Sequence, residues 1–122
     1  MSSQEQIPTL DKDALHRLRR DLPVGGLDKV LKSFATELVR RGEILESLDV
    51  ETGTSELAAL AHGLKGSAAT FGAPGLATAA EDLEIVVGTG QPEDIRRARD
   101  AAATELHGLI DELNKVVESG RL

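Results

Sequence analysis

The chain of 122 residues has 21 acidic and 14 basic side chains, a formal net charge of -7, and it contains no cysteine. This acidity disfavours general binding to nucleic acid and to anionic membranes, because both are negatively charged. The lack of cysteine excludes disulfides, thiolate chemistry and cysteine-based zinc sites. Only 2% of the residues are aromatic, so the core must consist of Leu, Ile, Val and Ala, which suits closely packed helices better than a β-sandwich.

The first part of the chain predicts a polar tail and two helices. Residues 1–9 lack the apolar segment of a signal peptide and are interpreted as a tail. A short helix is expected after Asp11, and the segment from Pro23 to Gly26 ends it. A long helix is then expected over residues 27–50, with an interruption at its Arg-Gly pair that indicates either a bend or a frayed turn. Its inward stripe has helical spacing: Leu27, Leu31, Phe34, Leu38, Leu45 and Leu48.

The second part predicts three further helices joined by short connections. Proline is tolerated in a first helical turn and glycine commonly ends a helix, so these residues mark the boundaries. A threonine is a suitable N-cap because its hydroxyl can accept a hydrogen bond from the first turn. The expected helices therefore run from an N-cap at Thr54 to Gly72, from Pro74 to the glycines at 88–90, and from Pro92 to about Ser119–Gly120.

These elements predict an all-α fold. Short connections make consecutive helices antiparallel neighbours, so we expect an antiparallel up-down four-helix bundle with a short additional N-terminal helix, in one domain over residues 10–120. No apolar run reaches the roughly 18 residues of a membrane-spanning helix, and we expect a cytoplasmic monomer. The clustered arginines alternate with acids and are interpreted as solvated faces: Arg17, Arg19 and Arg20; Arg40 and Arg41; Arg96, Arg97 and Arg99.

His62 is the histidine with informative surroundings. At about 100° per residue, it points away from the apolar stripe of its helix, which consists of Leu57, Leu60, Leu64, Ala68 and Phe71. An exposed imidazole among small residues suits a reactive nitrogen that another protein must reach. His16 and His107 lack these surroundings and are interpreted as having no functional role. The outward neighbours of His62 are no larger than a methyl group: Ala58, Ala59, Gly66 and Ala69. The three alanines are candidate docking residues.

Four residues near His62 are of types that suit phosphoryl chemistry. Lys65 could pair with a phosphoryl group as a mobile charge. Gly66 leaves space beside the ring, although glycine costs about 1 kcal/mol relative to alanine inside a helix. Ser67 could donate a hydrogen bond to the ring or the phosphoryl group, or could be a small residue at the core edge. Glu84 returns to the level of His62 in an antiparallel hairpin, where it either orients the ring or is an ordinary surface residue.

The same stretch continues with further distinctive residues, so that the whole pattern is Ala61-His62-Gly63-Leu64-Lys65-Gly66-Ser67-Ala68-Ala69, Phe71-Gly72-Ala73, Leu76 and Leu83-Glu84. This pattern resembles the signature of histidine-containing phosphotransfer (HPt) domains of phosphorelays. The resemblance implies a four-helix bundle with an added N-terminal helix. It also implies that His62 is phosphorylated, that Lys65 steadies the phosphoryl group, that Gly66 keeps the approach open and that Glu84 bonds a ring nitrogen.

The resemblance further implies a phosphoryl carrier and not an enzyme. Such a carrier accepts a phosphoryl group from the phosphoaspartate of a receiver domain and passes it to the aspartate of another receiver. The expected partners are response-regulator receiver domains and a hybrid sensor histidine kinase. The chain has no glycine-rich phosphate loop and no acidic cluster suited to Mg²⁺, so the receiver must bring the metal, and no cofactor is expected.

Three alternatives differ in what they require of the chain. A helical bundle that binds receivers without carrying phosphate would not need His62. An enzyme with His62 as general base and Glu84 as orienter would need a concave pocket for its substrate. A metal site would need ligands at suitable spacing, which the three scattered histidines do not offer.

Overall fold

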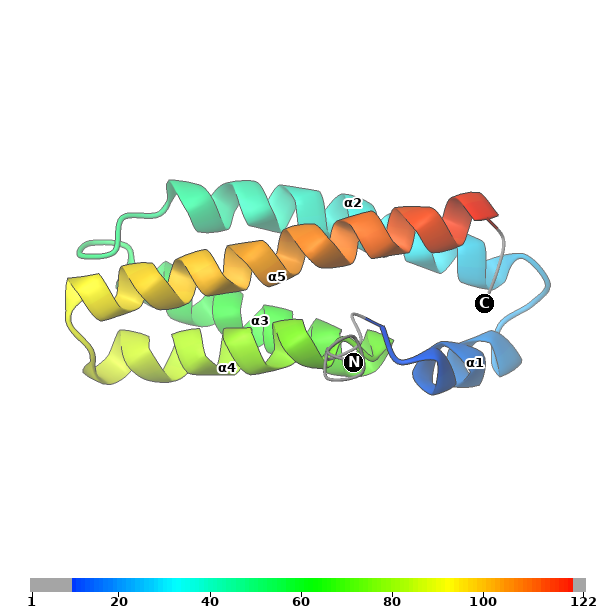
Figure 1. Ribbon diagram of the computed structural model, residues 1–122, viewed down its shortest axis with the longest axis horizontal. Helices are drawn as coiled ribbons and strands as arrows, with labels where there is room; N and C mark the ends of the chain where they lie inside the picture. Colours follow the sequence, from blue (N-terminus) through cyan, green and yellow to red (C-terminus); the bar gives the residue numbers. More distant parts are fainter. Residues whose placement is uncertain (1–9, 120–122) are drawn as a thin grey trace, which may run out of the picture.

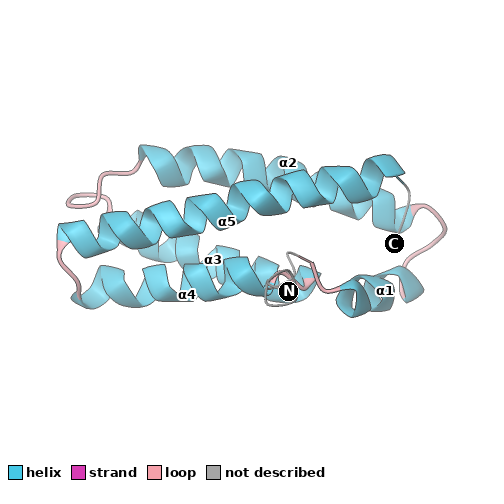
Figure 2. Ribbon diagram, viewed as in Figure 1, coloured by secondary structure: helices cyan, strands magenta, loops and turns pink. Residues whose placement is uncertain are grey.

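The computed structural model describes residues 10–119, which contain five helices and no strand, so the all-helical prediction is confirmed. The helices are α1 (Lys12–Arg20), α2 (Gly26–Ser47), α3 (Thr54–Phe71), α4 (Pro74–Thr89) and α5 (Pro92–Ser119). Figure 1 shows that α2 to α5 run along the long axis of the molecule and that the short helix α1 lies at one end, and Figure 2 shows that only short loops join them. The expected tail, residues 1–9, and Gly120 lie outside the described residues.

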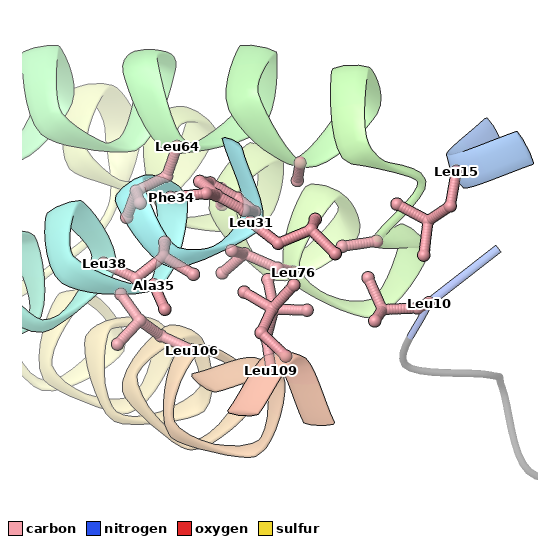
Figure 3. Close-up of a cluster of buried hydrophobic side chains, with 14 of the residues drawn as sticks. Leu10, Leu15, Leu31, Phe34, Ala35, Leu38, Leu64, Leu76, Leu106 and Leu109 are labelled. Atoms are coloured by element: carbon pink, nitrogen blue, oxygen red, sulfur yellow. The ribbon is translucent and has the colours of Figure 1, made fainter. Parts of the chain in front are cut away.

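The core fills the space between the four long helices. The closest packing is of α3 on α4, α4 on α5 and α5 on α2. Two adjoining groups of buried apolar side chains form the core, and Leu60 contacts both of them. Among the described residues, no polar or charged side chain is buried. Figure 3 shows how leucines of different helices meet in the larger group, among them Leu31, Leu38, Leu64, Leu76, Leu106 and Leu109.

The two phenylalanines of the chain pack against each other. Phe34 of α2 and Phe71 of α3 stack with ring centroids 3.9 Å apart and an interplanar angle of 11°. This pair brings α2 to the C-terminal end of α3, and the surrounding core is otherwise aliphatic. The prediction of a core of Leu, Ile, Val and Ala is therefore confirmed except at Phe34, which is also buried.

Two details of α2 and α3 differ from the sequence-based expectation. The helix α2 continues unbroken through Arg41 and Gly42 and ends at Ser47. Gly42 faces the core, where a Cβ would lie 2.9 Å from Cδ2 of Leu106, so that a larger residue would force the Leu106 side chain to shift. The N-cap of α3 is Gly53 and not Thr54, which is already helical.

The N-cap prediction failed because the helical hydrogen bonds start one residue earlier, with the N–H of Leu57 donating to the carbonyl oxygen of Gly53 at 2.9 Å. A Cβ at Gly53 would lie 2.9 Å from the backbone oxygen of Asp49, so this turn has no room for a capping side chain. The helix accordingly begins without a side-chain hydrogen bond at its cap.

Gly72 sets the turn between α3 and α4. Its φ of +70° is in the left-handed region, which favours glycine because it lacks a Cβ. Its carbonyl oxygen accepts a hydrogen bond from the backbone N–H of Asp11. A Cβ at this position would lie 2.7 Å from Cβ of Ala14 and 2.8 Å from that of Asp11. Gly72 therefore ends α3 and also allows α1 to pack against this end of the bundle, while Pro74 starts α4 at once.

Replacing Gly72 with alanine should destabilise the fold by about 2–4 kcal/mol, from a left-handed backbone and a steric clash combined. Gly25→Ala is the matched control, because Gly25 has a φ of +80° but open space around it, and should cost only about 1–2 kcal/mol. Urea denaturation of both variants measures the difference. Equal losses would contradict the close packing of α1 on Gly72.

Candidate functional site

His62 lies on the solvent-facing side of α3. Its side chain is 72% exposed, whereas the opposite side of the same helix buries Leu57, Ala61, Leu64 and Ala68. The neighbouring side chains are too small to cover the ring: Ala59, Gly66 and Ala69 are exposed and Ala58 is half-buried. A Cβ built at Gly66 would have no heavy atom within 4 Å. The fold therefore does not require glycine at position 66, and the space beside it is open to a partner.

Glu84 connects His62 with Lys65. One carboxylate oxygen of Glu84, Oε2, lies 3.0 Å from Nδ1 of His62. The other, Oε1, lies 3.3 Å from Nζ of Lys65. An ionised carboxylate can only accept hydrogen bonds, so Nδ1 must donate, and the neutral ring then leaves the lone pair of Nε2 free. A residue of α4 thus orients the exposed ring of His62 on α3.

The electrostatics keep this carboxylate ionised. The hydrogen bond from Lys65, and to a smaller extent that from His62, lowers the pKa of Glu84 below its ordinary value, while partial burial opposes the shift. A carboxylate with a lowered pKa contributes stability above the ordinary pKa of glutamate and loses it as the pH falls through the lowered value. The three-residue cluster is therefore intact at neutral pH and breaks apart in acid.

The structure places Ser67 away from this cluster. Its hydroxyl accepts a hydrogen bond from Nη1 of Arg41 on α2, with 3.3 Å between the two atoms, and no hydrogen bond joins it to His62 among residues 10–119. A role of Ser67 at the phosphoryl group stays a prediction.

The interpretation of the clustered arginines as solvated faces is wrong for two side chains. Arg99 of α5 is only 18% exposed, and its Nη1 donates to the backbone oxygen of Leu48 at 3.0 Å.

Arg41 of α2 is the second of these side chains. Its side chain is only 27% exposed, and its Nε lies 3.0 Å from Oε2 of Glu37, whereas the adjacent Arg40 is 62% exposed. Two features of the sequence could have indicated that Arg41 is held in place. Glu37 precedes it at i,i+4 spacing, and the small residues Gly63 and Ser67 leave room for its side chain beside α3.

The other histidines are placed differently. His107 of α5 is 58% exposed, and its Nε2 lies 3.0 Å from a carboxylate oxygen of Glu46 on α2. His16 lies on α1, far along the chain from this site. Within residues 10–119, no group of three or more His, Asp or Glu side chains is arranged to hold a metal ion. None of the five helices is both long and apolar enough to cross a bilayer.

Residues 29–117 match the family model of the Hpt domain. The chain belongs to the Hpt domain family. The resemblance that residues 61–84 suggested is thereby confirmed. Hpt domains are helical phosphocarriers, not enzymes, that act in two-component phosphorelays, where they interact with receiver domains and histidine kinases. Comparison with curated proteins and with solved structures found no match.

Replacing Lys65 with methionine should raise the pKa of Glu84, because the lysine hydrogen bond is the largest cause of its lowered value. Methionine keeps a long side chain on the helix and removes the charge. Titration of the Glu84 carboxyl carbon by NMR measures the shift. A pKa that is unchanged in the variant would contradict the ion pair between Lys65 and Glu84.

Proposed function

We propose that this Hpt domain carries a phosphoryl group on Nε2 of His62, accepting it from the phosphoaspartate of one receiver domain and relaying it to the aspartate of another. The observation that supports this proposal best is the carboxylate of Glu84, 3.0 Å from Nδ1 of His62 and 3.3 Å from Nζ of Lys65. It leaves Nε2 as the free ring nitrogen and holds a cation one helical turn away.

The transfer step needs only a lone pair on the ring. Nε2 attacks phosphorus in line, so that a P–N bond forms while the P–O bond to the aspartate breaks and the aspartate leaves as a carboxylate. The proton on Nδ1 stays in place, and the ring becomes positively charged during the attack. Glu84 stabilises this charge, because its carboxylate lies within hydrogen-bond distance of the ring. In the reverse direction the same groups return the phosphoryl group to a receiver aspartate.

Lys65 is the candidate for stabilising the phosphoryl group. Its ammonium is paired with Glu84 and its side chain is 38% exposed, so it can turn toward a phosphoryl group on the neighbouring ring. The remaining catalytic groups, including Mg²⁺, are expected from the receiver. In this proposal Ala58, Ala59 and Ala69 form the small surface on which the receiver docks.

The arrangement of the helices is part of the same proposal. We propose an antiparallel up-down four-helix bundle, α2 to α5, with α1 as the additional N-terminal helix, in one domain over residues 10–120. The course of the ribbon in Figure 1 supports this arrangement, because each short loop leads into a helix that returns along its predecessor. A cytoplasmic monomer remains the expectation, and light scattering after gel filtration tests the oligomeric state.

His62→Gln should fold normally and lose all phosphoryl acceptance, because glutamine has no nucleophilic nitrogen. The test is incubation with a phosphorylated receiver domain, followed by measurement of acid-labile, base-stable label on this chain. His107→Gln is the matched control, since His107 is also exposed and also paired with a carboxylate at 3.0 Å, and it should be labelled like the wild type.

Two outcomes would contradict this assignment. Label retained in His62→Gln would place the phosphoryl group on another residue. A receiver that binds the wild type without labelling it would favour a helical bundle that docks receivers and carries no phosphate.

Gly66→Leu should stabilise the helix by about 0.5–1 kcal/mol and yet strongly slow transfer. The stability gain is expected because the position is exposed and a Cβ there meets nothing within 4 Å. The loss of transfer is expected because the larger side chain occupies the approach to His62. Gly108→Leu is the control, since Gly108 is equally open and helical but lies on α5.

Urea denaturation and transfer rates from a phosphorylated receiver measure the two effects separately. Both leucine variants should be at least as stable as the wild type, and only the change at Gly66 should slow transfer. Unchanged transfer in Gly66→Leu would show that this glycine does not keep the approach open.

A further inference from the structure

Arg41 lies in a fixed position beside the His62 face. Its Nε donates to Oε2 of Glu37 at 3.0 Å, and its Nη1 donates to the hydroxyl of Ser67 at 3.3 Å. One bond is within α2 and the other reaches α3, so the guanidinium is held between the two helices. Its side chain is 27% exposed, which leaves part of the group accessible from solvent.

The position of the guanidinium relative to His62 follows from Gly63. Nη1 of Arg41 lies 3.6 Å from the place of a Cβ at Gly63, the residue that follows His62. On a helix, Gly63 is rotated by about 100° to one side of His62, and Lys65 by about 60° to the other side. The imidazole therefore has a cation on each flank, with Lys65 toward α4 and Arg41 toward α2.

The guanidinium retains free donor capacity. An arginine has five N–H groups, and two of them take part in the bonds to Glu37 and Ser67. The other three have no hydrogen-bond partner within residues 10–119. A guanidinium binds carboxylates and phosphates through paired donors, and a side chain that is already held loses less entropy when it binds.

The charge of the incoming partner suits this arrangement. A receiver that delivers a phosphoryl group to His62 presents a phosphoaspartate, which is anionic, at the surface of a chain whose own net charge is -7. Cations beside the acceptor nitrogen reduce the repulsion between the two. Arg40 cannot serve in the same way, because no bond joins it to α3 and its side chain is 62% exposed.

We infer that Arg41 is a partner-contacting residue that binds an anionic group of the phosphorylated receiver on the α2 flank of His62. This inference rests on the proposed function and names a specificity-determining residue for it. Arg41 does not contact the reacting atoms, so it acts on the binding of the receiver and not on the nucleophilicity of the ring.

The test compares Arg41→Gln with Arg40→Gln. Each variant removes one positive charge and one ion pair with Glu37, but only the first removes the cation held against α3. Binding of the receiver domain that labels the wild type is measured by calorimetry at low and high salt. Arg41→Gln should raise the Kd about tenfold at low salt, with a smaller effect at high salt, whereas Arg40→Gln should change it less than twofold.

A second measurement separates docking from damage to the site. Phosphoramidate can label an exposed histidine without any receiver, so Arg41→Gln should accept this label at the wild-type rate. Arg41→Lys keeps the charge without the paired donors and should bind with intermediate affinity. If circular dichroism shows that Arg41→Gln is less well folded than the wild type, the affinity of Arg41→Lys still tests the inference.

The outcomes distinguish the inference from the function on which it rests. Wild-type labelling by the receiver with equal Kd values for the two glutamine variants would overturn the role of Arg41 alone. Parallel losses of receiver binding and phosphoramidate labelling in Arg41→Gln would assign Arg41 to the structure of the site and also overturn it. A wild type that no phosphorylated receiver labels would overturn the proposed function, and the inference with it.

Discussion

The contact between Glu84 and His62 depends on the register of α3 against α4. The two residues are 22 positions apart, and both are equally distant in sequence from Ala73, which lies in the turn. A helix rises about 5.4 Å per turn, so a slip of one turn would carry the carboxylate beyond hydrogen-bond reach of the ring. The left-handed Gly72 and the immediate start of α4 at Pro74 fix this register, and the orientation of the His62 ring follows from it.

Much of this arrangement could be predicted because it depends on residues that are close in sequence or on the geometry of a single hairpin. Helical spacing of apolar residues identified the buried sides of α2 and α3, since burial follows from the period of the helix. Proline and glycine marked the end of α3, both ends of α4 and the start of α5 to within one residue. The level of Glu84 followed from the geometry of a tight hairpin, without any knowledge of the rest of the bundle.

The features that sequence reasoning missed depend on helices distant in sequence. Gly42 looked like an interruption of α2, but it admits Leu106, a residue of α5 that no local pattern links to it. Arg41 looked like one of several solvated arginines, and its bond to Ser67 is visible only once α2 and α3 are placed together. Thr54 had the right chemistry for an N-cap, but the tight turn at Gly53 decided the boundary instead.

The two sides of α3 differ in composition because one side packs in the core and the other faces solvent. One side buries leucine and alanine in the core, while the other carries His62 among residues too small to contribute much to stability. Each cation on this outer face is paired with a carboxylate, Lys65 with Glu84 and Arg41 with Glu37. The positive charges beside His62 are therefore balanced by neighbouring carboxylates in the described part of the chain. An anionic partner that approaches His62 meets Lys65 on the α4 flank of the ring and Arg41 on the α2 flank.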